Sequence, residues 1–212
     1  MPSAAAHERS ILTSATLSTW QVRHMVPLQA VLAALNAAKV EFVIAGAHAI
    51  GGYTKKPRAT VDVDVVIAPK AHKKDVKALR EAFPDLIVRD LQVVTRFIDP
   101  PTKEAVIDLM KPKDALLKTI FANSVAVKLE GQAARIPDLE MAAATKFAAM
   151  VGVCRKHPDK LQDAADFARI IDANPKLDIE RLARLGELVY SGGGSEVRGL
   201  ARAVRDRKPL VF

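Results

Sequence analysis

The sequence has few of the residues that cross-link chains, bind zinc or stack on bases. Its 212 residues include one cysteine, Cys154, one tryptophan and two tyrosines, and aromatic residues make up only 5%. A single cysteine excludes an internal disulfide and a zinc site built from cysteines, and it suits a reducing, cytoplasmic environment. The scarcity of aromatics predicts an aliphatic core and disfavours a base-stacking platform for nucleic acids.

Long apolar runs are also missing. The longest uncharged stretches, Met25–Ala38 and Phe42–Thr54, are shorter than the roughly 18 residues that a membrane span needs. We therefore expect no membrane partner. The first ten residues show no basic segment followed by an apolar one, so we expect no secretory signal, and we interpret residues 1–20 as a flexible lead-in.

Acidic residues are outnumbered by basic ones. The chain has 24 Asp and Glu against 32 Lys and Arg, a formal net charge of +8, and 50% of its residues are hydrophobic. The hydrophobic fraction excludes a disordered chain and predicts one domain or a compact pair. The positive charge attracts polyanions such as RNA, DNA and nucleotides, although a basic protein without such a partner has the same composition.

The order of predicted elements changes near Pro137. Before it, we expect helices at 26–38, 47–52, 69–83 and 112–122, strands at 41–45, 60–67, 85–88, 92–98 and 105–109, and a hairpin at 125–136. After it, we expect helices only, at 138–153, 158–172 and 178–190, then a glycine loop at 191–195 that links to a basic terminal helix. This pattern predicts an α/β (α+β) protein with a small mixed sheet flanked by helices. We place a catalytic domain at 21–137 and a helical domain at 138–212.

Paired carboxylates in the strand Thr60–Ile67 give the strongest chemical signal. Asp62 and Asp64 are two residues apart, so on a strand they share a face, roughly 6.5–7 Å from each other. Two carboxylates held this way suit Mg²⁺ or Mn²⁺, and Asp108 in a third apolar strand would complete a site for two metal ions. The alternative is that both aspartates lie on the solvated face of an edge strand.

Two segments around these aspartates resemble a known family. Residues 44–49 read Ile-Ala-Gly-Ala-His-Ala, and residues 58–64 read Arg-Ala-Thr-Val-Asp-Val-Asp. The pattern resembles the nucleotidyltransferases of the DNA polymerase β superfamily, most closely the abortive-infection type IV toxins. In that group a strand ends in a glycine motif, an Arg-x-Thr or Arg-x-Ser follows, and Asp-x-Asp lies on the next strand. Asp108 stands where a later strand of the family carries a third acidic residue.

The resemblance implies a role for each motif residue. Asp62, Asp64 and Asp108 would be catalytic and would bind the metal, with Asp108 helping to activate the acceptor hydroxyl. The residues expected to bind the nucleoside triphosphate (NTP) substrate are Gly46, Ala47, Arg58, Thr60, Lys146 and Asp163. The family has Gly or Ser where this chain has Ala47, which keeps a backbone contact but offers no hydroxyl.

The helical part continues the resemblance through residues Lys146, Arg155, Lys160, Asp163 and Asp166. Lys146 is the only cation between Arg135 and Arg155, so it is either a triphosphate contact or a surface lysine. Asp159, Asp163 and Asp166 share one helix face, for which we favour a solvated charged surface.

The resemblance implies a metal-dependent transfer of a nucleoside monophosphate from an NTP to an acceptor hydroxyl on RNA, including tRNA, or on a protein. It also suggests the toxin of a toxin–antitoxin module, with a cognate antitoxin as partner. Two alternatives remain open. One is a nucleotidyltransferase that modifies small molecules such as antibiotics. The other, which Ala47 keeps open, is an inactive member of the fold that binds a nucleotide or a partner protein.

Overall fold

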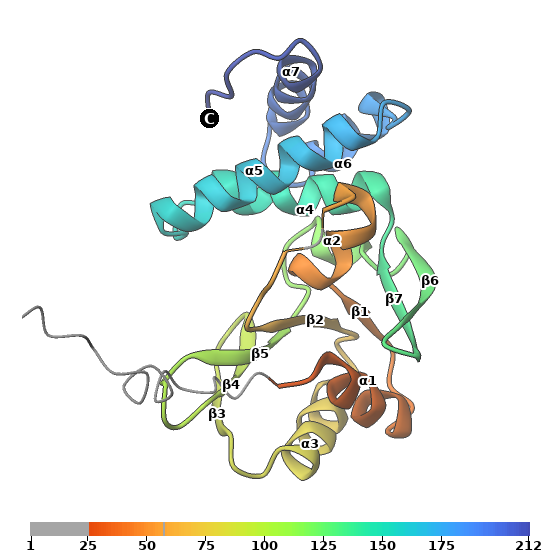
Figure 1. The fold of residues 1–212 in the computed structure, drawn as a ribbon, viewed down its shortest axis with the longest axis vertical. Coiled ribbons are helices and arrows are strands. Elements are labelled where there is room, and N and C mark those ends of the chain that lie inside the picture. Colours follow the sequence, from red (N-terminus) through yellow and green to blue (C-terminus); the bar gives the residue numbers. More distant parts are fainter. Residues whose placement is uncertain (1–25, 57) are drawn as a thin grey trace, which may run out of the picture.

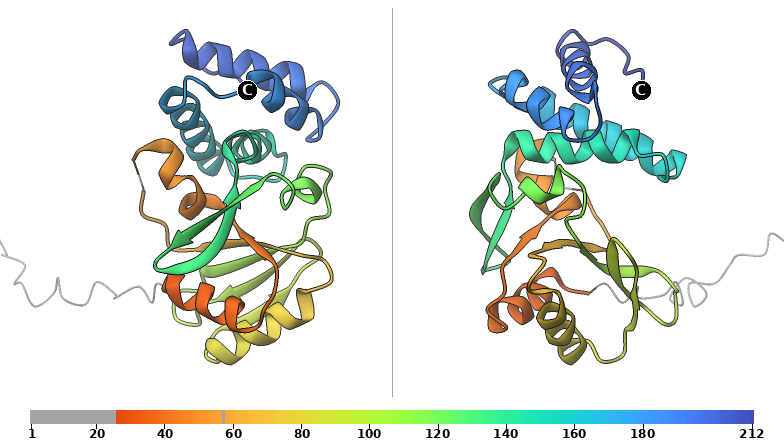
Figure 2. Two further views of the ribbon diagram at one scale, coloured as in Figure 1. Left: turned by 90° about the vertical axis from the view of Figure 1, so that its right-hand side faces the viewer. Right: turned by 180° about the vertical axis from the view of Figure 1, so that it is seen from behind.

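The computed structural model describes residues 26–56 and 58–212. The lead-in predicted at 1–20 lies outside these residues. A five-stranded sheet forms the middle of the molecule, with two helices on one side and a larger group of helices on the other (Figure 1). The two further views show the same three layers (Figure 2). The predicted α+β class, a small mixed sheet followed by a helical region, is confirmed.

The elements follow one another in this order: α1 Leu28–Ala37, β1 Phe42–Ile44, α2 Gly46–Thr54, β2 Val63–Ile67, α3 His72–Ala82, β3 Ile87–Asp90, β4 Val94–Ile98, β5 Ala105–Met110, a 3₁₀ turn Leu117–Thr119, β6 Ser124–Leu129, β7 Gln132–Pro137, α4 Leu139–Val151, α5 His157–Ala173, α6 Ile179–Glu187 and α7 Gly193–Arg205. Within the described residues, no helix is long and apolar enough to span a membrane.

The strand order β1-β2-β5-β4-β3 brings the second and fifth strands together at the centre of the sheet. These two strands run parallel, and the other neighbours are antiparallel, so the sheet is mixed. The predicted hairpin is present as β6 and β7, a separate two-stranded sheet that turns at Glu130 and Gly131. Both turn residues have positive φ, as a tight hairpin requires.

Two apolar cores lie on the two faces of the five-stranded sheet. The first is formed by the sheet with α1 and α3, and includes Leu35, Leu79 and Phe97. The second joins Val66 of the sheet to α2 and the later helices, through residues such as Phe147 of α4. Since the second core contains side chains from both sides of Pro137, the helical region is fixed against the sheet. The division into domains at 21–137 and 138–212 stays a prediction.

Several predicted boundaries are wrong for local reasons. The helix predicted at 112–122 is only the 3₁₀ turn Leu117–Thr119, in which the N–H groups of Thr119 and Ile120 bond to carbonyls three residues back. Asp114 caps its start through the N–H of Leu117. Strand β2 begins at Val63 and not at Thr60, so Asp62 lies just before the strand. Helix α2 continues through Gly51 and Gly52 to Thr54, two residues beyond the predicted end.

The predicted glycine loop at 191–195 is also different in the structure. Gly193 and Gly194 form the first turn of α7, and they lie against the backbone of α6. A β-carbon on Gly193 would stand 2.4 Å from the carbonyl oxygen of Gly186. These glycines therefore allow two helices to pack closely, which a pattern of turn residues does not reveal.

Candidate active site

One row of charged residues crosses the face of the sheet that looks toward the helical region. In the strand register, Asp64 of β2 is beside Asp108 of β5, Asp108 is beside Arg96 of β4, and Arg96 is beside Arg89 of β3. Residues paired across strands share a face of the sheet. The register therefore brings two carboxylates together at the centre of the sheet and two arginines toward its edge.

Gly46 covers the carboxylate of Asp64. It follows β1, has φ +59°, and begins α2. A β-carbon at this position would stand 2.0 Å from Asp64 Oδ2, a distance that no real side chain tolerates. Glycine is thus required twice over, by the left-handed backbone and by the close approach of the carboxylate. The backbone N–H of Ala45 also donates to the carbonyl oxygen of Asp64, at 2.8 Å.

The charges around Asp64 are unusual. Burial, together with the negative charges of Asp62 and Asp108, raises the pKa of Asp64 to about 7. The positive charges of Lys146 and Arg155, in the helical region, oppose this shift. The site therefore concentrates negative charge on the sheet and positive charge on the helices.

Asp108 is held by one partner and leaves one oxygen without a hydrogen bond. Arg96 Nε lies 3.3 Å from Asp108 Oδ1 as an ion pair, but within the described chain no donor is aligned to hydrogen bond to that buried oxygen. Burial raises the pKa of Asp108, the charge of Arg96 opposes the shift, and the charge of Asp62 adds to it. Arg96 therefore compensates the charge of this buried oxygen, although its N–H is not aligned for a regular hydrogen bond.

Asp62 lies at the entrance to β2 and is fixed by its neighbours. The Thr60 hydroxyl donates a short hydrogen bond to Asp62 Oδ1. His48, in the first turn of α2, is near Asp62, and burial lowers the pKa of its imidazole although the charge of Asp62 opposes this. A neutral imidazole and a hydroxyl thus border the carboxylate. Thr60 contacts Asp62 directly and fixes the orientation of its carboxylate.

Lys146 is buried among carboxylates and is not a surface lysine. Its side chain is 8% exposed, and its Nζ lies 2.9 Å from Asp163 Oδ1 and 3.0 Å from Asp166 Oδ2. Both aspartates are 1% exposed, so the solvated charged face that we favoured for them is wrong. The apolar side of α5 carries them inward with Phe167 and Ile170, where α4 supplies the compensating lysine.

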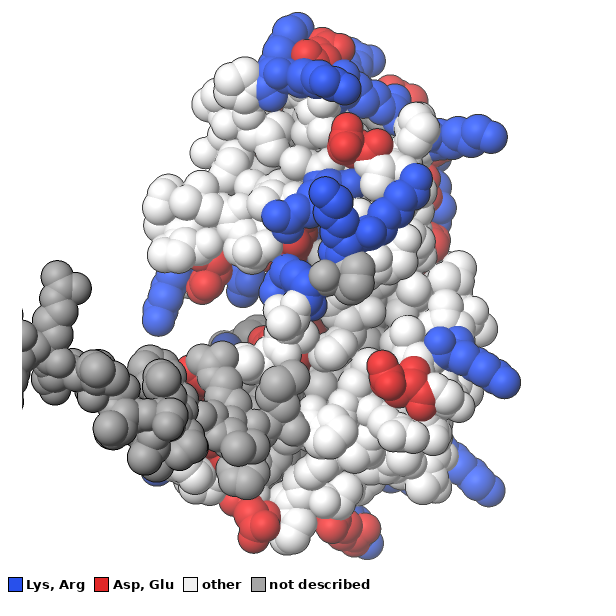
Figure 3. Space-filling model, in the orientation of Figure 1, with Lys and Arg blue, Asp and Glu red and all other residues white. Residues whose placement is uncertain are grey.

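Three arginines surround the two buried aspartates. Arg155 Nε is 2.5 Å from Asp163, while Arg58 Nε and Arg169 Nη1 are each 3.3 Å from Asp166. The arginine side chains are 34–48% exposed. Arg58 and Arg155 are held through Nε, so the ends of their guanidinium groups remain available. Lysine and arginine side chains gather along the side of the helical region that is nearer the sheet (Figure 3).

The sheet carboxylates fit a divalent metal in chemistry but are not arranged as a finished metal centre. Among residues 26–56 and 58–212, no group of three His, Cys, Asp or Glu side chains is placed to hold an ion as it stands. The repulsion of Asp64 by the charges of Asp62 and Asp108 is a condition that a cation would relieve. Small movements of the carboxylates would be needed to bind it.

Known proteins share this fold although sequence comparison finds none. The chain matches no protein-family model and no curated protein in sequence. In structure, it resembles an antigenic nucleotidyltransferase-like protein from Paracoccidioides brasiliensis, with a TM-score of 0.50, 16% identity, and 86% of this chain and 93% of that one covered. The chain has a nucleotidyltransferase-like fold.

A second protein with this fold is similar to the same extent. The antibiotic-resistance factor ANT(2″)-Ia matches with a TM-score of 0.54 and 15% identity, over 84% of this chain and 93% of its own. Both likenesses extend over the sheet and the helices, because each covers more than four fifths of this chain. At this low sequence identity, the two similarities establish the fold of the chain and do not establish its substrates.

Within this nucleotidyltransferase-like fold, the residues singled out in the sequence fall into two groups. Those on or beside the sheet are Gly46, Ala47, Thr60, Asp62, Asp64 and Asp108, and those at the helical border are Arg58, Lys146 and Asp163. Arg96 was not singled out. In the sequence, Arg96 is a charged residue between Thr95 and Phe97, and the structure buries both of these neighbours fully. Because side chains alternate along a strand, Arg96 lies on the opposite face of β4.

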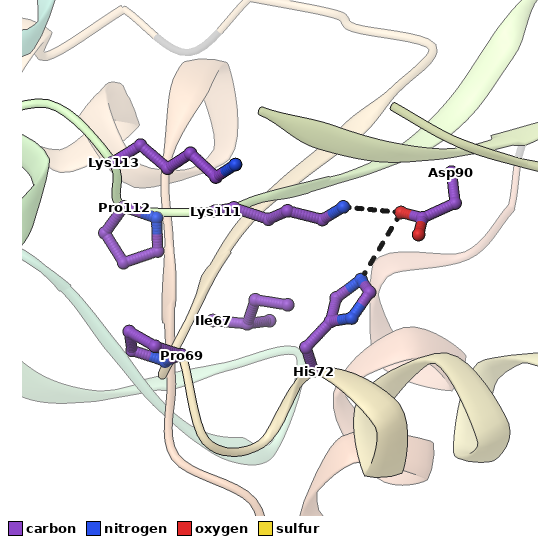
Figure 4. Close-up of a pocket in the computed structure, with 7 residues that line it drawn as sticks. All are labelled: Ile67, Pro69, His72, Asp90, Lys111, Pro112 and Lys113. Atoms are coloured by element: carbon purple, nitrogen blue, oxygen red, sulfur yellow. Dashed lines mark hydrogen bonds and ion pairs between the residues drawn. The ribbon is translucent and has the colours of Figure 1, made fainter. Parts of the chain in front are cut away.

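A separate pocket lies at the other end of the central strands. It has a volume of about 280 Å³ and is lined by Ile67, Pro69, His72, Asp90, Lys111, Pro112 and Lys113 (Figure 4). Lys111 Nζ lies 2.5 Å from Asp90, and the buried Thr95 hydroxyl bridges Asp90 and His72. These polar groups bind one another, and none of them belongs to the site predicted from the sequence.

Proposed function

We propose that this protein is a metal-dependent nucleotidyltransferase that moves a nucleoside monophosphate from an NTP to an acceptor hydroxyl. One observation carries the proposal. Asp64 and Asp108 are side by side on the sheet, next to the glycine turn at residue 46, and the positive charges of Lys146 and Arg155 act on Asp64. Carboxylates for a cation and cations for phosphates thus border the same space, as the in-line displacement at a phosphate requires.

The first turn of α2 would bind the phosphates of the NTP. Its N-cap residue, Ala45, provides no side-chain hydrogen bond, so the amides at the start of this nine-residue helix are not capped by it. Helix amides and the helix dipole favour an anion at this end. Ala47 is 8% exposed and belongs to the buried side of α2, and only its backbone N–H could contribute a hydrogen bond to a phosphate.

Asp62, Asp64 and Asp108 would hold Mg²⁺ or Mn²⁺ at the sheet. When bound, such an ion neutralises charge on the attacking and leaving oxygens of the transferred phosphate. The residues themselves contribute position. Gly46 allows the Asp64 carboxylate to lie against the backbone, and Thr60 orients Asp62. Asp108, beside Asp64, would accept a proton from the acceptor hydroxyl.

The exposed ends of Arg58 and Arg155 would bind the outer phosphates, which leave as pyrophosphate, and Lys146 would contribute its positive charge. Arg58 and Arg155 have exposed ends, whereas Lys146 is enclosed between Asp163 and Asp166. We therefore assign Asp163 to positioning, because it is buried and both its oxygens are occupied by cations. The buried aspartates keep the arginines at fixed places, so that fewer side-chain rotations are lost when phosphates bind.

The acceptor is proposed to be RNA, including tRNA, with a protein hydroxyl as the alternative. The net charge of +8 favours a polyanion. On this basis and on the resemblance of the motifs, we propose that the protein acts as a toxin of the abortive-infection type IV kind, inside the cytoplasm and with an antitoxin as partner. The catalytic domain would comprise residues 21–137 and the helical domain residues 138–212.

A small-molecule acceptor is the second candidate, and the fold of an antibiotic-resistance factor favours it. A basic antibiotic needs acidic groups at the acceptor side. Here Arg96 lies against Asp108, where the acceptor hydroxyl would bind, and Arg89 follows on the next strand. These two positive charges disfavour a cationic acceptor. An inactive nucleotide-binding role is the third candidate, and it requires nucleotide binding without turnover.

The test is transfer of label from each α-³²P-labelled NTP with Mg²⁺ or Mn²⁺, in the presence of total RNA, the protein alone, or an aminoglycoside. The double variant Asp62→Ala/Asp64→Ala serves as the control. Label in RNA or protein that disappears in the control supports the proposal and names both nucleotide and acceptor. Label in the aminoglycoside alone favours the second candidate. Metal-dependent nucleotide binding in calorimetry without any transfer favours the third.

A further inference from the structure

We propose that Arg96 and Arg89 form a binding track for the phosphates of the acceptor RNA, leading across the sheet from the catalytic carboxylates to its edge. This inference rests on the proposed function, because it names where the acceptor of that reaction lies. It assigns a binding site to two arginines that the motifs do not contain. The ligand class is single-stranded RNA whose 3′-terminal hydroxyl is at Asp108.

The register of the sheet gives the track its direction. Asp64, Asp108, Arg96 and Arg89 are paired in turn across β2, β5, β4 and β3, so all four lie on one line and one face. Neighbouring strands are about 4.8 Å apart, and the line therefore extends about 14 Å from the first carboxylate to the last arginine. A chain of phosphates that starts at the carboxylates and runs to the edge follows this line.

Both arginines are available to a ligand. The Arg96 side chain is 47% exposed, although its Nε contacts Asp108. Arg89 is exposed, and within residues 26–56 and 58–212 it forms no ion pair. Its neighbours Val88 and Asp90 point to the opposite side of β3, where Val88 packs against the first core.

The two arginines are unfavourably placed in the absence of an anion. They are direct partners in an antiparallel pair, where like charges destabilise a sheet. Asp108 compensates only Arg96, from the other side. A phosphate near both guanidinium groups would remove the repulsion and accept their hydrogen bonds.

The helical region also carries positive charge near Asp64. Arg155 and Lys156, at the junction of α4 and α5, are both exposed, and Arg155 is close enough to Asp64 to influence its pKa. An acceptor that enters between the helices and the sheet would thus meet positive charge on both sides. This arrangement attracts a polyanion and repels a polycationic antibiotic.

The experiment measures binding separately from chemistry. A single-stranded RNA oligonucleotide with a 3′-deoxy end cannot accept a nucleotide, so its fluorescence anisotropy reports binding alone. Wild-type protein is compared with Arg89→Gln, with Arg89→Gln/Arg96→Gln, and with the control Arg80→Gln/Arg202→Gln. The control removes the same charge from α3, on the other side of the sheet, and from α7, at the far end of the molecule (Figure 1).

We expect the track variant, Arg89→Gln/Arg96→Gln, to bind the RNA about tenfold more weakly than the wild type at low salt. The slope of log K against log salt should become less steep by about 1.4, because each lost phosphate contact removes about 0.7. Arg89→Gln alone should lose about half of this slope and, without RNA, should keep or raise the melting temperature. Equal behaviour of track and control variants, no binding by the wild type, or a lower melting temperature for Arg89→Gln would overturn the track.

The two proposals fail in different ways. If the wild type binds the blocked RNA through the track but transfers no label to an unblocked one, the track stands and the transferase proposal falls. If label enters RNA and the track variant binds as the control does, the transferase proposal stands and the track is wrong.

Discussion

The carboxylate of Asp64 occupies the space that a side chain on residue 46 would need. A β-carbon built on Gly46 would be 2.0 Å from Asp64 Oδ2 and 3.2 Å from Asp64 Cβ. The contact joins the end of β1 to the centre of the sheet, and it places the start of α2 directly beside a catalytic candidate. The glycine turn and the aspartate therefore form one structural unit.

Gly46→Ala should destabilise the protein and abolish activity. The left-handed backbone at residue 46 alone costs about 1–2 kcal/mol for alanine, and displacement of the Asp64 carboxylate adds to this cost. Gly52→Ala in the same helix is the control, because no atom lies within 4 Å of its added β-carbon. It should be neutral or stabilising by about 0.5–1 kcal/mol. Urea unfolding of both variants checks this, and equal effects would contradict it.

Lys146→Met should be strongly destabilising, by about 3–5 kcal/mol, because it leaves the buried charges of Asp163 and Asp166 without their central partner. Lys77→Met is the control. Lys77 is 76% exposed and pairs with Glu81 one turn away, so its loss should change stability by less than about 0.5 kcal/mol. Chemical denaturation of the two variants measures the difference, and a mild effect of Lys146→Met would show that the network is solvated.

Asp75 should make stability depend on pH. It is 0% exposed in α3, neither of its carboxylate oxygens has a hydrogen bond to the described part of the chain, and burial raises its pKa from 3.8 to about 7. The folded protein therefore binds more protons than the unfolded chain between about pH 4 and 7. Its contribution to stability is present below pH 4 and is lost as the pH rises through 7.

Asp75→Asn removes this dependence, because the amide has nearly the shape of the neutral acid. We expect the variant to match the wild type near pH 4 and to be more stable at pH 8, by roughly 2–4 kcal/mol. Thermal melting across this range is the measurement. A constant difference between the two proteins at all pH values would show that Asp75 does not titrate in the window.

Gly186→Ala should loosen the contact between α6 and α7. Its β-carbon would stand 2.5 Å from Val197 Cγ1 and 2.9 Å from the carbonyl oxygen of Gly193, so α7 must move, at a cost of about 1–3 kcal/mol. Gly199→Ala on α7 meets no atom within 4 Å and should stabilise the helix slightly. Differential scanning calorimetry should separate the two melting temperatures, in opposite directions from the wild type.

The sequence predicts those parts of the site that depend on neighbouring residues. A short apolar run that ends at Gly46 and an alternating run through Asp64 are local patterns, so the strand, the turn and the next strand could all be anticipated. The mixed sheet and the change to helices after Pro137 follow from patterns of the same kind.

What the sequence does not reveal depends on contacts between distant segments. Burial of Asp163 requires Lys146, which is 17 residues away on another helix, and the spacing on α5 alone equally suits a solvated face. Arg96 becomes a neighbour of Asp108 only through the pairing of β4 with β5. Strand order and register are set by the whole fold and not by either strand alone.

The most direct test of the account follows the two ends of the triphosphate. The wild type and Asp64→Asn are incubated with Mg²⁺ or Mn²⁺, total RNA, and each NTP labelled either at the α- or at the γ-phosphate. The account predicts that α-label enters the acceptor, that γ-label appears as pyrophosphate in equal amount, and that Asp64→Asn does neither. Transfer of γ-label to the acceptor, or equal α-transfer by Asp64→Asn, would contradict it.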